Sequence, residues 1–77
     1  MKSFDIFFKT IVDVKNFVNI VNKYDFDIDL ESGRYLIDAK SIMGIFSLNL
    51  AKPIKVYIHS DNTDTIEKEL EQFKDLP

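Results

Sequence analysis

A strict alternation of acidic and apolar side chains over residues 25–30 constrains the fold of this chain more than any other feature. This pattern is typical of a half-buried β-strand, in which the apolar residues face the core and the aspartates face the solvent. We therefore expect Phe26, Ile28 and Leu30 to point inward. Residues 31–33 predict a turn, because Gly33 adopts a positive φ at little cost. Residues 34–39 return as a second strand, so the pair predicts a β-hairpin and an antiparallel sheet.

The rest of the chain switches between the apolar period of strands and that of helices. Residues 2–8 and 54–58 alternate, which predicts two more strands. A first helix is expected to start at Asp13, whose carboxylate can accept the free amides of the first turn, and to stop near Asn22. Two further helices are expected. The first is short and continues to about Leu50, with Ile42, Phe46 and Asn49 on one stripe and Met43, Ile45 and Leu48 around it. The final helix is expected to bury Ile66, Leu70 and Phe73.

The predicted order is therefore β-α-β-β-α-β-α, which is typical of a two-layer α+β fold. Seventy-seven residues suit a single domain spanning residues 1–77. Apolar residues make up 45% of the chain and seven are Phe, which is enough for a compact core. Cysteine is absent, so packing alone must stabilise this fold, without disulfides or thiolate metal ligands.

The charge and the hydropathy of the chain exclude several classes of function. A net charge of −3 argues against general nucleic-acid binding, which needs a basic surface to neutralise phosphates. No apolar run approaches the length of a membrane span. Charged residues interrupt the apolar N-terminus too early for a signal peptide. We therefore expect a soluble cytoplasmic protein without a membrane or nucleic-acid partner.

Residues 41–52 carry a dense pattern, SIMG followed by SL and AK, with two residues between each part. This pattern resembles SIMG-x-x-SL-x-x-AK of HPr, the small phosphocarrier of the bacterial sugar phosphotransferase system. Residues 23–25, KYD, stand at the expected distance upstream, whereas Asn49 and Pro53 depart from the family pattern. The resemblance implies an HPr-like open-faced sandwich with a four-stranded antiparallel sheet and three helices on one face. It also implies a protein that is not an enzyme.

The family's carrier histidine opens the first helix, 31 residues before the serine of SIMG, and counting back from Ser41 reaches Thr10. Val12 stands at the family's arginine position and Asp13 at its proline position. A threonine phosphoester is far more stable than a phosphoramidate and would not pass its phosphoryl group on. Val12 offers no charge to hold a phosphate, and Asp13 would repel it. The chain thus resembles a divergent, Crh-like member of the family without the carrier histidine.

Ser41 has two readings that are compatible. It can be an ordinary helix N-cap, as serine often is at a helix start. By resemblance to the family, it is also a candidate for regulatory phosphorylation by an HPr kinase/phosphorylase. A phosphate there would lie at a helix N-terminus, with Lys40 adjacent and Lys52 as a second cation if the helix folds back.

Ile42, Met43 and Phe46 are candidates either for the core or for a partner-binding face. In the family the corresponding surface docks other proteins. His59 is the only histidine, and we expect an ordinary exposed strand residue rather than a phosphoacceptor or metal ligand. The aspartates of residues 25–29 predict a solvated face balanced by Lys55, and no metal or other cofactor is expected.

The sequence therefore predicts a regulatory or adaptor protein of the phosphotransferase system that is inactive as a histidine phosphocarrier. The partners implied by the resemblance are proteins: the HPr kinase/phosphorylase or a catabolite-control transcription factor. Two alternatives remain open at this point. The chain could be a working phosphocarrier through an unrecognised acceptor, or a protein-interaction scaffold whose serine is never modified.

Overall fold

A computed structural model describes all residues from 1 to 77, and its backbone forms one four-stranded sheet. The strands are β1 (Lys2–Ile6), β2 (Ile28–Ser32), β3 (Tyr35–Asp38) and β4 (Ile54–Ile58). They lie in the order β1-β4-β2-β3, and every neighbouring pair is antiparallel. The helices are α1 (Ile11–Val21), α2 (Ile42–Phe46) and α3 (Asp64–Leu70), and a 3₁₀ turn, η1 (Glu71–Phe73), continues α3.

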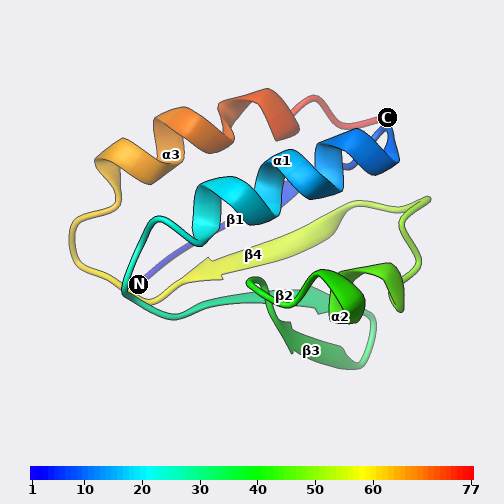
Figure 1. Cartoon of the computed structure of the whole chain (residues 1–77), viewed down its shortest axis with the longest axis horizontal. Coiled ribbons are helices and arrows are strands. Elements are labelled where there is room, and N and C mark those ends of the chain that lie inside the picture. The colour runs from blue at the N-terminus through cyan, green and yellow to red at the C-terminus, as the bar shows by residue number, and fades with distance from the viewer.

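All three helices cover the same face of the sheet, so the predicted α+β sandwich and its element order are confirmed (Figure 1). Helices α1 and α3 run side by side, and α2 lies beside α1 near the β2–β3 hairpin. The C-terminal residues return to the start of α1 (Figure 1).

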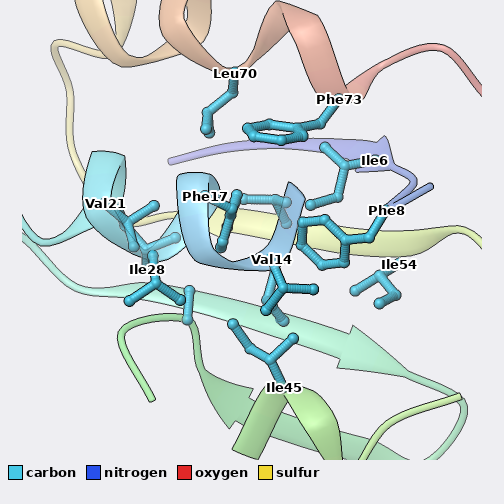
Figure 2. Packing of buried hydrophobic residues seen from close by; sticks show 14 of the residues in the cluster. Ile6, Phe8, Val14, Phe17, Val21, Ile28, Ile45, Ile54, Leu70 and Phe73 are labelled. Atoms are coloured by element: carbon cyan, nitrogen blue, oxygen red, sulfur yellow. The ribbon is translucent and has the colours of Figure 1, made fainter. Parts of the chain in front are cut away.

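Seventeen buried apolar residues form the core between the sheet and the helices. The alternating strands supply most of their inward side chains as predicted, although Phe26 lies before β2 and is only partly buried. The stripes of α1 and α3 are also buried as predicted. These core residues are Ile28, Leu30, Ile54, Val56 and Ile58 from the sheet, and Val14, Phe17, Val18, Val21, Ile66 and Leu70 from α1 and α3. Figure 2 shows Phe8, Phe17 and Phe73 gathered at the end of α1 where the chain enters the helix. This cluster anchors the segment that precedes α1.

The hairpin turn differs by one residue from the prediction. Ser32 pairs with Tyr35, so the two-residue turn consists of Gly33 and Arg34, with Gly33 at φ +60°. A positive φ favours glycine, because glycine has no Cβ to clash with the backbone. Two-residue turns with a positive φ are common in hairpins, because their twist matches that of the flanking strands. Strand β2 begins only at Ile28, so the first two aspartates of the alternating segment lie in the loop before it.

The boundaries of two helices also differ from the prediction. Helix α1 begins at Ile11 with Thr10 as its N-cap, and Asp13 lies inside the first turn. Helix α2 is much shorter than expected and ends at Phe46 instead of continuing to residue 50. The hydroxyl of Ser47 donates to the carbonyl of Gly44 (2.6 Å), and the side chain of Asn49 accepts the amide of Ala51 (3.1 Å). These local hydrogen bonds compete with the helical ones and end the helix.

Candidate functional site

The start of α1 is closed by a reciprocal pair of capping hydrogen bonds. Thr10 has extended backbone angles (φ −144°, ψ 167°), and its hydroxyl oxygen accepts the amide of Asp13 at 3.2 Å. The Asp13 carboxylate in turn accepts the backbone amide of Lys9 at 2.8 Å. This arrangement is a variant of the capping box, in which each side chain satisfies a backbone donor that the helix leaves free.

The segment that carries Thr10 is held from two sides. The Phe8 ring packs edge-on against Phe17 and Phe73, with ring centroids 5.2 and 5.8 Å away. The Lys9 ammonium pairs with the carboxylate of Asp75, and this hydrogen bond raises the pKa of Lys9 and lowers that of Asp75. The C-terminal segment is thereby tied to the start of α1, and the cation next to Thr10 already has an acidic partner.

The start of α1 presents a threonine hydroxyl and an aspartate carboxylate. No histidine is present there, because His59, the only one, follows β4, and its ring nitrogen Nε2 lies 2.9 Å from the Asp29 carboxylate. The Val12 side chain is 60% exposed and carries no charge. An oxyanion on Thr10 would meet the Asp13 carboxylate in the first turn, where an anion-binding helix start needs free amides.

The start of α2 is capped by Ser41, as predicted. The Ser41 hydroxyl oxygen accepts the amide of Gly44 at 3.2 Å, and the residue is exposed. A Cβ on Gly44 would lie 3.1 Å from that oxygen and 3.4 Å from Cδ1 of Ile37. Gly44 therefore permits the close approach that both the cap and the packing of α2 on β3 require.

The two lysines expected near Ser41 are placed differently. The Lys40 ammonium donates to the carbonyl of Tyr24 at 2.7 Å, which ties the α2 start to the loop after α1. Lys52 lies beyond the opposite end of α2, in a pocket that Ser41 does not line. The structure shows no hydrogen bond between Lys52 and Ser41, so the conditional expectation of a second cation there gains no support.

The three candidate partner-binding residues on α2 differ in burial. Met43 is 76% exposed and Phe46 is 39% exposed. Ile42 is half-buried and packs against the core, while Ile45 is fully buried. The predicted stripe of Ile42, Phe46 and Asn49 does not form on one helix, because α2 ends at Phe46. Ile45 and Leu48 are the residues that enter the core.

Helix α1 adds two exposed apolar residues that the sequence interpretation did not assign to a surface. Ile11 and Val12 are 63% and 60% exposed, and they precede the buried stripe of α1. Val14 of α1 faces Ile45 of α2 in the core, so the two helices are neighbours (Figure 2). We refer to Ile11, Val12, Met43 and Phe46 together as the α1–α2 apolar surface.

The acidic residues around β2 form no metal site. No three side chains of His, Cys, Asp or Glu converge in a way that could hold an ion. Asp29 pairs with His59, and the Glu31 carboxylate accepts the Tyr57 hydroxyl at 2.8 Å. The expectation that Lys55 balances this face is not borne out, because Lys55 makes no ion pair, while His59 and Tyr57 contact two of the carboxylates.

The lysine and tyrosine of the KYD segment have a structural role. The Tyr24 hydroxyl donates to the carboxylate of Glu69, and this hydrogen bond raises the pKa of Tyr24 to about 12. Lys23 pairs with the same carboxylate and, together with Tyr24, lowers the pKa of Glu69. The loop after α1 is thereby fastened to α3.

None of the helices has the length and apolar character that a membrane span requires.

Comparison with known proteins is consistent with this geometry. A family model described as the PTS HPr component phosphorylation site matches residues 14–76, a stretch that begins just after the α1 cap. A crystal structure of HPr-C-His from Thermoanaerobacter tengcongensis is similar, with 28% identity, a TM-score of 0.78, and coverage of 94% of this chain and 89% of that one. The phosphocarrier protein HPr from Bacillus anthracis str. Ames also shares 28% identity, with a TM-score of 0.67 and coverage of 94% and 93%. The chain therefore belongs to the HPr family.

Proposed function

We propose that this protein is a regulatory or adaptor member of the phosphotransferase system that does not carry a phosphoryl group on histidine. The observation that carries the proposal is the capping arrangement at the start of α1. Thr10 occupies the helix-opening position that the family resemblance assigns to the carrier histidine. Its hydroxyl oxygen and the Asp13 carboxylate are both used to satisfy backbone amides.

Three physical changes at this position act in the same direction. A hydroxyl replaces the imidazole that would form a labile phosphoramidate. The Val12 side chain supplies no cation for the phosphate oxygens. The Asp13 carboxylate places a negative charge where a phosphate dianion would need a positive potential. A phosphocarrier needs all three features at once, so the loss of all three favours a role in binding over a role in transfer.

Ser41 is the residue through which such a protein would be regulated. It is exposed at the start of a helix, so a kinase could reach its hydroxyl. A phosphate would add a charge of about −1.5 to −2 at neutral pH close to exposed Met43. Such a change beside an apolar surface would alter which protein binds there. By family resemblance, the partners are an HPr kinase/phosphorylase and a catabolite-control transcription factor, and the protein acts in the cytoplasm.

Intact-mass measurement after two separate incubations tests the proposal. In the first, the protein is mixed with phosphoenolpyruvate and Enzyme I, with an active HPr as the positive control. In the second, it is mixed with ATP and HPr kinase/phosphorylase, with Ser41→Ala as the matched control. We expect no mass gain in the first reaction and one phosphate in the second, lost in the Ser41→Ala variant.

The other outcomes separate the alternatives. An acid-labile phosphate that depends on Enzyme I would show a working phosphocarrier with another acceptor, and would overturn the proposal. Absence of phosphate in both reactions would overturn the regulatory role of Ser41 and leave a scaffold whose serine is only a helix cap.

A further inference from the structure

A pocket lies between the turn of the β2–β3 hairpin and the segment that follows α2. Arg34 and Tyr35 line it from the hairpin, and Asn49 and Lys52 line it from the other side. Ser32 and Ser47 complete its polar wall, and no acidic residue contributes to it. The pocket is therefore framed by two segments that are distant in the chain, and each supplies one cation.

The charge of this pocket is unusual for the protein that contains it. The chain has 13 acidic and 10 basic residues, and Arg34 is its only arginine. Four lysines pair with carboxylates elsewhere. Arg34 and Lys52 are among the six basic residues that make no ion pair, and they are the only charged residues that line the pocket. The pocket thus concentrates two uncompensated positive charges on an acidic protein, which favours the binding of an anion.

The neighbouring polar groups add hydrogen-bond donors. The hydroxyls of Tyr24 and Tyr57 donate to carboxylates, whereas that of Tyr35 has no protein partner. The Asn49 side-chain oxygen accepts the amide of Ala51, which leaves its amide nitrogen free to donate. An arginine fork, an ammonium, a phenol and an amide together suit a ligand with three terminal oxygens and two negative charges.

The pocket is large enough to admit a small anion. Its volume is about 280 Å³, at the lower end of the roughly 300–1,000 Å³ typical of sites for small ligands. A carboxylate presents two oxygens and one charge, so it would leave one cation and several donors unused. A phosphate group matches both the number of donors and the charge.

We propose that the pocket between the β2–β3 turn and residues 47–52 binds the phosphate group of a small phosphate monoester, with Arg34 and Lys52 as its cationic ligands. This site is separate from the start of α1 and from Ser41, since neither Thr10 nor Ser41 lines it. It therefore does not depend on the proposed regulatory function.

Two-dimensional NMR of the ¹⁵N-labelled full chain tests the site directly. The protein is titrated with inorganic phosphate, methyl phosphate or acetate at constant ionic strength and about pH 8. At this pH methyl phosphate, whose second pKa is about 6, is a dianion, and inorganic phosphate is mostly a dianion. We expect saturable shifts at the amides of Gly33, Arg34, Asn49 and Lys52 with both phosphates, and only weak, non-saturating shifts with acetate.

Charge-neutralising variants identify the ligands. Arg34→Gln and Lys52→Gln should each raise the dissociation constant about tenfold, the effect of losing one charge-assisted hydrogen bond. Lys68→Gln is the matched control, because Lys68 is exposed on α3, makes no ion pair and lies outside the pocket. It should change the dissociation constant less than about twofold, as expected for a distant, screened charge.

Three results would overturn the proposal. Shifts that stay linear in phosphate would show general ionic effects rather than a site. An equal response to acetate would show that the pocket does not select a dianion. An equal weakening by Lys68→Gln would show that net charge, and not the pocket, attracts the ligand. Both pocket variants alter exposed side chains, so unchanged resonances elsewhere verify the fold of each.

Discussion

Replacing Met43 by Asp tests whether the α1–α2 apolar surface is a docking face. Full burial of a methionine side chain stabilises a fold by roughly 1.5–3 kcal/mol. Met43 is 76% exposed, so it contributes only about a quarter of this free energy. The expected loss of unfolding free energy is therefore about 0.4–0.7 kcal/mol, or roughly 2–6 °C in melting temperature for a domain of this size. The new carboxylate lies in the first turn of α2, where it interacts favourably with the helix dipole and reduces this loss.

The effect on binding should be much larger than the effect on stability. If Met43 lies near the centre of the docking face, its replacement by a charge should weaken partner binding by about 2 kcal/mol or more, which is roughly 30-fold. The assay pairs thermal melting with the rate at which HPr kinase/phosphorylase phosphorylates Ser41 at low substrate concentration. Met43→Gln separates the loss of apolar contact from the gain of charge.

Two controls make the reading unambiguous. Thr65→Asp adds the same charge at the equivalent position of α3, where the side chain is exposed, and should leave the phosphorylation rate unchanged. Ile45→Ala removes a fully buried side chain of α2 and should cost about 2–5 kcal/mol of stability. If Met43→Asp unfolds the protein as Ile45→Ala does, or if its phosphorylation rate equals that of Thr65→Asp, the reasoning is refuted.

Four further predictions follow from the caps and the titrating groups. Thr10→Ala should lower the unfolding free energy in urea by about 1 kcal/mol, whereas Thr10→Ser should retain most of it. Thr10→His alone should gain little Enzyme I-dependent phosphate by intact mass, because the Asp13 carboxylate remains in the first turn. Ultraviolet titration should show Tyr24 ionising near pH 12, and Glu69→Gln should return the pKa of Tyr24 toward its usual value. Because folding raises this pKa, the stabilising contribution of Tyr24 is complete below about pH 10 and is lost as the pH rises to about 12. Phosphorylation of Ser41 should leave the melting temperature unchanged or raise it, through a helix-dipole effect of about 0.3–1 kcal/mol, and a large drop in calorimetry would contradict this.

The sequence was sufficient to predict the order of the elements, because the period of its apolar residues changes at each boundary. Residues 54–58 alternate and form β4, and the stripe of Val14, Phe17 and Val21 becomes the buried face of α1. Burial is the dominant favourable term in folding, so a pattern of apolar residues that suits one element order excludes most others. The SIMG pattern of residues 41–44 pointed to the family.

Local polar chemistry was harder to predict, since several residues could perform the same role. Thr10 and Asp13 both carry an oxygen that caps a helix, and sequence alone could not choose between them. The burial of Phe8 and the pairing of Lys9 with Asp75 bring the chain into α1 so that Thr10 is the cap. Likewise, the apolar run of α2 was compatible with several inward faces until Ile45 met Val14 across the core (Figure 2).

Only the tertiary structure decided which distant residues meet. Arg34 and Lys52 read as unrelated surface cations in the sequence, and nothing in their spacing predicts that they share a pocket. They do so because the antiparallel register of β2 and β3 places the hairpin turn where α2 ends, and because α2 stops at Phe46. Periodicity reports which face of an element is buried, but the meeting of two loops depends on the lengths of the elements between them and on how those elements pack.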